Sequence, residues 1–182
     1  DPSAPPGPKA EATPGDAGTV ADATGPAAAA YLSSLDKDGF VRMVGDVAWF
    51  SVGAPEAPVV YMVADPQCPF CHAAWSKLRP MVTARKLAVN VILISGLKGS
   101  EPLSISLLSR PEPGKAWFAG EGSEQGVPIA PPPAADSQAH RDAKTFLEIN
   151  NRFAREVGLK GTPFFAYVGK DGKLYSAEGP RD

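Results

Sequence analysis

The stretch VVYMVADPQCPFC, residues 59–71, decides the fold because it joins an apolar strand to a helix and places two cysteines at the junction. Residues 59–64 form a continuous apolar, β-prone run, which is typical of a strand buried on both faces of a sheet. Residues 65–67 end this strand, and apolar positions from Cys68 to about Arg85 indicate a helix. The sequence therefore predicts a buried strand followed at once by a helix.

The later part of the chain continues to alternate strands and helices. Residues 87–95, rich in Val and Ile, are expected to form a second buried strand. A helix with three-and-four apolar spacing is expected from a cap at Asp136 or Ser137 to Gly158. Residues 163–177 are expected to form a hairpin. This order predicts an α/β fold with a final antiparallel hairpin.

A tail, a short helix and an edge strand are expected before this framework. Residues 1–26 are dominated by Ala, Pro, Gly and Asp, a composition that predicts a flexible tail because it buries too little apolar surface to offset the ordering entropy. Residues 27–182 are expected to form the domain. Helical spacing predicts a short helix before Gly45, and an edge strand is expected over residues 47–52.

One long segment within the domain lacks clear periodicity. Residues 96–138 are expected to form an irregular insertion with one short helix at 103–108. Pro111, Pro113 and the prolines at 131–133 are expected to break the remainder, because proline removes a backbone donor. The insertion lies between the second strand and the late helix.

Bulk composition excludes some classes of function. The 182 residues include 43% hydrophobic ones, enough for one sizeable core. A formal net charge of −2 gives no electrostatic support for nucleic-acid binding. No run approaches the roughly 20 apolar residues of a membrane-spanning helix. The chain opens without a basic and then apolar segment, so we expect that any export signal was removed before residue 1.

The chain has two cysteines, Cys68 and Cys71, and both belong to one Cys-Pro-Phe-Cys motif. At the start of a helix, Cys68 faces unpaired amide groups and the positive end of the helix dipole, which stabilise a thiolate. Cys71 lies one turn further on the same face, close enough to attack a mixed disulfide on Cys68. Pro69 suits the first turn because it has no amide proton. We expect Cys68 to be the nucleophile and Cys71 the resolving thiol.

Other interpretations of the motif remain open on sequence alone. Half of a zinc site is one, although four-coordinate zinc would need further Cys or His and the chain has only His72 and His140. The string ending in His72 also matches the attachment motif of c-type haem, with Met81 as a distal ligand. A merely structural thiol pair is the third. Because the motif follows a buried strand in an α/β pattern, redox chemistry is favoured, with the Cys68 and Cys71 disulfide as the active group and no metal or separate cofactor.

A second informative motif is Gly161-Thr162-Pro163, directly before the strand of the hairpin. In an oxidoreductase it fits a cis-proline loop beside the cysteines, with the Thr162 backbone exposed to pair with an extended substrate segment. An ordinary trans proline at the start of a strand is the alternative. Thr162 and Pro163 are therefore the candidate substrate-orienting residues.

Several segments in a fixed order carry a family resemblance. They are Ala64-Asp65-Pro66-Gln67-Cys68-Pro69-Phe70-Cys71, Trp75, Leu78-Arg79-Pro80, Ile94-Ser95-Gly96 and Gly161-Thr162-Pro163. Over roughly residues 47–178 the chain resembles the periplasmic thiol:disulfide interchange proteins of the Dsb group, of the DsbG and DsbC type. The resemblance implies a thioredoxin-like fold with a helical insertion, a periplasmic location, and a cysteine pair kept reduced by a membrane electron donor of the DsbD type. It also implies isomerisation or reduction of oxidised cysteines, including sulfenic acids, in client proteins.

The chain departs from that family in three ways. Dimeric relatives carry an N-terminal dimerisation domain, which the Ala- and Pro-rich tail cannot replace, so dimerisation lacks support; the tail could instead tether the domain. The chain ends at Asp182, where relatives continue into a closing helix. Met62 occupies the strand position where thioredoxin has an acid, which argues against a thioredoxin-like proton relay.

Two residues beside the cysteines have roles that the sequence leaves open. Phe70 lies between the cysteines and is expected to contact substrate. His72 could tune the thiolate, although a solvated helix residue is the favoured interpretation. The leading hypothesis is a disulfide isomerase or reductase acting on client proteins. A net dithiol oxidase of the DsbA type and a non-catalytic chaperone-like binding module are the alternatives.

Overall fold

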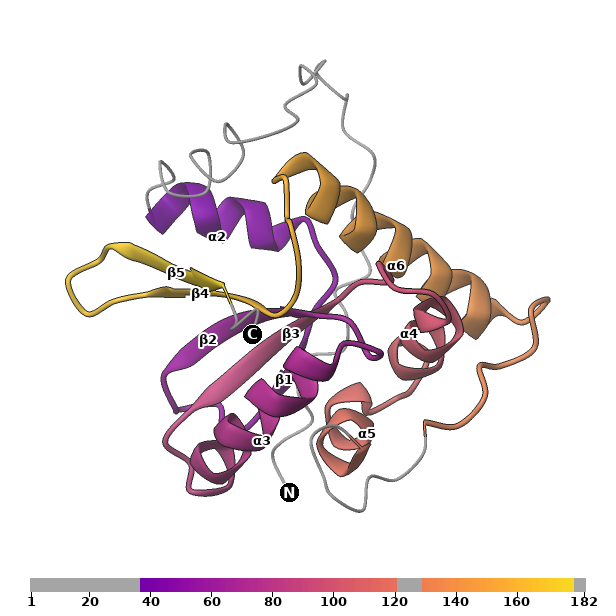
Figure 1. The fold of residues 1–182 in the computed structure, drawn as a ribbon, viewed down its shortest axis with the longest axis horizontal. Coiled ribbons are helices and arrows are strands. Elements are labelled where there is room, and N and C mark those ends of the chain that lie inside the picture. The colour runs from indigo at the N-terminus through magenta and orange to yellow at the C-terminus, as the bar shows by residue number, and fades with distance from the viewer. Residues whose placement is uncertain (1–36, 121–128, 179–182) are drawn as a thin grey trace.

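The computed structural model of the chain describes residues 37–120 and 129–178. Its five-stranded sheet has the order β1-β3-β2-β4-β5 (Figure 1). The strands are β1 (Phe50–Val52), β2 (Val59–Ala64), β3 (Ala88–Leu93), β4 (Phe164–Val168) and β5 (Leu174–Glu178). The helices are α2 (Lys37–Gly45), α3 (Pro69–Thr83), α4 (Ser100–Leu108), α5 (Pro113–Gly120) and α6 (Gln138–Glu156). This arrangement confirms the predicted α/β fold with a final antiparallel hairpin.

The unit β2-α3-β3 forms the centre of the fold. Strands β2 and β3 are parallel neighbours, with Val59 opposite Ala88 and Ala64 opposite Leu93. β3 is buried along its whole length, whereas β2 is buried only in its second half, Met62 to Ala64. The prediction of a strand buried on both faces therefore holds for β3 and for the end of β2 that leads into the cysteines.

The main core lies between the sheet and the side of the molecule formed by α3, α4 and α5 (Figure 1). Its buried strand residues include Met62, Ala64, Val89, Val91 and Leu93; its helical residues include Cys71, Trp75, Ile105, Leu107, Trp117 and Leu147. The Trp75 and Trp117 rings meet edge to face, with centroids 5.8 Å apart. This contact packs α5 against α3. Such aromatic pairs stabilise a fold beyond the burial of their apolar area.

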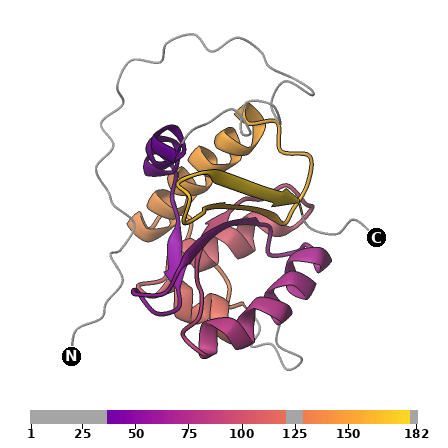
Figure 2. The same ribbon diagram turned by 90° about the vertical axis from the view of Figure 1, so that its left-hand side faces the viewer.

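Helix α2 and the second half of α6 cover the opposite face of the sheet (Figure 2), whereas the first half of α6 joins the main core through Leu147. Val63 and Ile92 pack on this opposite face against Phe153 and Val157 of the second half of α6. Phe40 of α2 packs in a further cluster with residues of β4 and β5. Both faces of the central strands are therefore shielded from water, as is usual for parallel strands such as β2 and β3.

The insertion contains two helices, as the helical insertion implied by the family resemblance requires, and is more regular than its residue pattern alone predicted. The short helix expected at residues 103–108 is present as α4, which begins earlier, at Ser100. A second helix, α5, begins at Pro113, which was expected to break the chain. The prediction failed because proline is tolerated in the first turn of a helix, where its missing amide proton has no intrahelical partner.

The N-terminal predictions are met where the structure describes them. Strand β1 pairs only with β3, in antiparallel register, and is the expected edge strand. The predicted helix before Gly45 is present as α2. The predicted flexible tail, residues 1–26, lies outside the described residues.

A buried asparagine fastens α6 to the sheet. Asn150, fully buried, accepts a hydrogen bond from the Ala48 amide at 2.9 Å. Its own amide donates to the carbonyls of Ala48, at 2.8 Å, and Leu93, at 2.9 Å. One side chain therefore satisfies three backbone groups at the entrance to β1 and at the end of β3.

We expect Asn150→Ala to destabilise the fold by about 3 kcal/mol or more, because each buried group left without a partner costs about 1–3 kcal/mol. Chemical denaturation measures this difference. Glu148→Ala is the matched control on the exposed face of the same helix, and it should change stability by less than about 0.5 kcal/mol. Equal losses for the two variants would contradict this role for Asn150.

Candidate active site

The two cysteines lie at the start of α3. Cys68 is the N-cap residue and has extended backbone angles, with φ −80° and ψ 115°. Its carbonyl accepts hydrogen bonds from the amides of Cys71, at 3.1 Å, and His72, at 3.2 Å. Pro69 is the first residue of the helix. The Cys68 side chain therefore lies at the N-terminus of α3, where the helix dipole favours negative charge.

The loop before β4 meets this helix start. The Thr162–Pro163 peptide bond is cis, as the sequence motif suggested. The Cys68 thiol donates a hydrogen bond to the Thr162 carbonyl, with 3.3 Å between Sγ and the oxygen. Two segments 94 residues apart therefore meet at one sulfur atom.

Both cysteines are buried and belong to the main core, but Cys68 is 4% exposed and lines the groove described below, whereas Cys71 is 0% exposed. Burial raises the pKa of the Cys71 thiol from its ordinary value of 9.0 to about 12, against the opposing effect of hydrogen bonds from the Asp65 backbone and the Thr162 side chain. A charge on Cys68 raises this pKa further. Cys71 is therefore held as a neutral thiol at neutral pH.

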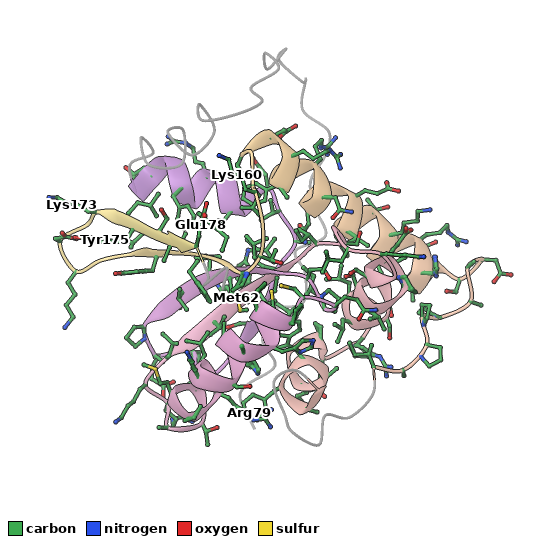
Figure 3. The ribbon with its side chains drawn as sticks, viewed as in Figure 1. Met62, Arg79, Lys160, Lys173, Tyr175 and Glu178 are labelled. Atoms are coloured by element: carbon green, nitrogen blue, oxygen red, sulfur yellow. The ribbon has the colours of Figure 1, made fainter. Side chains whose placement is uncertain are left out.

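A groove of about 690 Å³ opens beside Cys68. Its lining includes Phe70, Leu97, Thr162 and Pro163 around that sulfur. Lys160, between α6 and β4, and Glu178, at the end of β5, add charged groups to the lining. Figure 3 labels both residues near the loop that precedes β4. The cysteine with access to this groove is Cys68, whereas Cys71 is not among its lining residues.

The remaining predicted site residues lie around the helix start. Phe70 is 37% exposed, and Pro69 is also exposed. His72 is half-buried and follows Cys71 on α3. Met62, labelled in Figure 3, is fully buried in the main core. The structure thus brings Cys68, Thr162 and the groove together and leaves Met62 as a core residue.

The sequence analysis missed Asp65 as a site residue. This carboxylate is 1% exposed and lines the groove. It accepts hydrogen bonds from the amides of Gln67, Gly96 and Leu97 and from the hydroxyl of Ser100. A charged residue directly after a buried strand was the signal that could have identified it, because buried charges need several partners.

Two further properties concern the described part of the chain. No group of three or more His, Cys, Asp or Glu side chains in residues 37–120 and 129–178 is arranged to hold a metal ion. Among those same residues, no helix combines the length and the apolar character needed to cross a bilayer.

Residues 49–179 match the model of the thioredoxin-like domain family, and the chain belongs to this family. Within it, the chain is similar to the thiol:disulfide interchange protein DsbG of Escherichia coli, with 29% identity over 136 residues, and to DsbG of Pseudomonas aeruginosa, with 32% identity over 138 residues. These alignments cover 74% and 72% of this chain but 53% and 51% of the two relatives. The chain therefore spans about half the length of the curated relatives it matches.

Solved structures support the same fold. The structure is similar to that of Proteus mirabilis ScsC in a compact conformation, with a TM-score of 0.55 and 19% identity over 84% of this chain and 78% of that chain. The thiol-disulfide exchange protein alpha-DsbA2 from Wolbachia pipientis gives a TM-score of 0.52 and 16% identity over 87% and 94% of the two chains. At these identities the likeness concerns the fold alone.

We predict that the Cys71 thiol resists alkylation at a pH where an ordinary thiol reacts. At pH 9 an exposed thiol with the ordinary pKa of 9.0 is half ionised, whereas burial, the largest cause of the raised pKa of Cys71, persists without Cys68 and favours the protonated thiol. In reduced Cys68→Ser protein, iodoacetamide should leave Cys71 unmodified at pH 9, as measured by mass spectrometry. The same variant unfolded in urea is the control and should be alkylated. Rapid labelling of the folded variant at pH 9 would contradict the raised pKa.

Proposed function

We propose that this chain is a protein thiol-disulfide oxidoreductase in which Cys68 is the nucleophile and Cys71 the resolving thiol. The observation that carries the proposal is the contact of Cys68 Sγ with the Thr162 carbonyl at the edge of an open groove. Cys71 is buried one helical turn behind it. The similarity to DsbG, whose name describes thiol:disulfide interchange, supports the same chemistry.

The proposed cycle transfers two electrons to a client. The Cys68 thiolate attacks one sulfur of a client disulfide; a bond from Cys68 to that sulfur forms, the client disulfide breaks, and the second client sulfur leaves as a thiolate that takes up a proton. Cys71 then loses its proton and attacks the Cys68 sulfur, which releases the first client sulfur as a thiol. The protein is left with a disulfide between Cys68 and Cys71, and the client is reduced.

The same two cysteines could also reduce a client sulfenic acid. Cys68 would attack its sulfur, expel the hydroxyl as water and form a mixed disulfide, which Cys71 would resolve as before. When Cys71 does not attack first, a second client thiol can attack the mixed disulfide, and the client disulfide is then rearranged. We propose isomerisation and reduction as the net activities, with no metal or separate cofactor.

The neighbouring residues would orient the client. Thr162 and Pro163 border the groove beside Cys68, so the Thr162 backbone could pair with an extended client segment that holds the attacked cysteine. Phe70, exposed between the cysteines, offers an apolar contact to that segment. Pro69 fixes the first turn between the two sulfurs. His72 remains a candidate for tuning Cys68 through its place on the same helix.

The cellular setting follows from the similarity to DsbG and belongs to the proposal. We propose a periplasmic protein whose cysteine pair is kept reduced by a membrane donor of the DsbD type and whose N-terminal residues tether the domain. The clients would be proteins with disulfides or oxidised cysteines. The chain covers about half of its curated relatives, and dimerisation is not proposed.

We predict that Cys68→Ser abolishes the reduction of insulin by the protein in the presence of glutathione, because the attacking sulfur is lost. Cys71→Ser should instead accumulate a mixed disulfide with the client, because the attack that resolves it is lost. Turbidity measures the first result and non-reducing mass spectrometry the second. A His140→Ala variant, altered on α6 at the far end from the groove, is the control and should keep full activity.

Two outcomes would contradict this assignment. Insulin reduction by Cys68→Ser at the wild-type rate would exclude Cys68 as the nucleophile. Binding of unfolded clients without exchange by the wild-type protein would favour the chaperone-like alternative.

The reduction potential of the cysteine pair and its redox partner together decide the direction of exchange. For an isomerase or reductase we expect a potential of about −180 mV or lower, whereas a net oxidase is expected near about −120 mV. Equilibration with glutathione redox buffers, read by the mass of the alkylated forms, measures the potential. A value near that of the oxidase would replace the isomerase proposal with the DsbA-type alternative while leaving both cysteine roles in place.

A further inference from the structure

We propose that Asp65 is a positioning residue that holds one wall of the groove in place for the client. The wall is residues 95–97, the segment between β3 and α4. The inference rests on the proposed function and adds to it a residue that determines client binding through this wall.

The side chain of Asp65 connects the end of β2 to that wall. Its Oδ2 atom accepts hydrogen bonds from the amides of Gly96, at 2.8 Å, and Leu97, at 3.0 Å. Its Oδ1 atom accepts from the amide of Gln67, at 2.8 Å, and from the hydroxyl of Ser100 at the start of α4. Because hydrogen bonds to a charged group are among the stronger ones, this carboxylate defines where the wall lies relative to the cysteines.

The backbone of Asp65 reaches the reactive site directly. Its carbonyl accepts a hydrogen bond from the Cys68 amide at 3.0 Å. Its backbone also hydrogen-bonds to Cys71, which lowers the pKa of that thiol. One residue therefore contacts both cysteines through its main chain and the groove wall through its side chain.

The other end of the wall is held by Asn151 of α6. Its carbonyl oxygen accepts from the Ser95 amide at 2.8 Å, and its amide donates to the Ser95 hydroxyl at 2.9 Å. The wall itself ends in Leu97, whose side chain is 46% exposed. Asp65 thus fixes the part of the wall that carries an exposed apolar side chain, a surface suited to an apolar residue of the client.

The hydrogen bonds of Asp65 argue against a second role, in which its carboxylate would accept the proton of Cys71. Both carboxylate oxygens already accept two hydrogen bonds each. A carboxylate has about four lone-pair sites. No acceptor site is left for the Cys71 proton, so the geometry assigns Asp65 to positioning.

The test compares three variants in steady-state reduction of insulin by the full chain. Asp65→Asn puts an amide donor opposite groups that all donate, so part of the network must break in either orientation. Ser100→Ala removes one donor and leaves the carboxylate. Ser106→Ala is the matched control, because Ser106 is an equally buried serine of α4 whose hydroxyl donates to Ala130 instead.

We expect Asp65→Asn to raise KM for insulin about tenfold and to lower kcat by a smaller factor, because a displaced wall weakens client binding. Ser100→Ala should raise KM roughly threefold, and Ser106→Ala should leave KM unchanged. If Asp65→Asn does not fold, as judged by thermal unfolding, Ser100→Ala against Ser106→Ala carries the test.

Two results would overturn the inference. One is an equal KM for Ser100→Ala and Ser106→Ala together with an unchanged KM for any folded Asp65→Asn protein. The other is a fall in kcat at constant KM for Asp65→Asn, the signature of a lost proton acceptor. Failure of the proposed function itself would appear separately, as wild-type protein that does not reduce insulin.

Discussion

The antiparallel pairing of β2 with β4 is the constraint on which the site depends. Val63, the penultimate residue of β2, lies opposite Phe164, the first residue of β4. The chain that leaves β2 and the chain that enters β4 therefore occupy the same end of the sheet. The contact of Cys68 with the Thr162 carbonyl follows from this register, because a shift by one residue would turn every side chain of β4 to the other face.

The two thiols at this end of the sheet are unequal. Both sulfurs belong to the main core with Trp75 and Met62, but Cys68 lies at the helix start and lines the groove, whereas Cys71 does not reach it. Burial favours the neutral form of Cys71, so its proton is lost most readily when attack on the Cys68 sulfur is under way. Thr162 serves both sulfurs, since its carbonyl accepts from Cys68 and its side chain hydrogen-bonds to Cys71. This asymmetry is the physical basis for assigning attack to one cysteine and resolution to the other.

Sequence periodicity predicted the elements whose stability comes from one continuous apolar pattern. The expected strand at residues 59–64 has the observed bounds of β2, and α6 begins after Ser137, one of the two candidate caps. The prediction missed α5, because Pro113 is compatible with either a break or a helix start, and only its packing through Trp117 decides between them.

Polar residues with distant partners could not be predicted in the same way. The sequence shows Asp65 only as the residue that ends a strand, because three of its four donors lie 31 to 35 positions further along the chain. The partners of Asn150 in Ala48 and Leu93 are likewise separated by 102 and 57 positions. Their roles depend on the tertiary structure rather than on any local pattern.

Asp65 and Asn150 perform the same kind of task at the two ends of one structural path. Asn150 fixes the end of β3 at Leu93, its neighbour Asn151 fixes Ser95, and Asp65 fixes the following two amides. Apolar packing alone tolerates small shifts of a loop, since it has little directional preference, whereas hydrogen bonds to buried side chains specify individual backbone atoms. The segment that follows β3 is therefore placed residue by residue, and the side of the groove that faces Cys68 is as well defined as the sheet from which it extends.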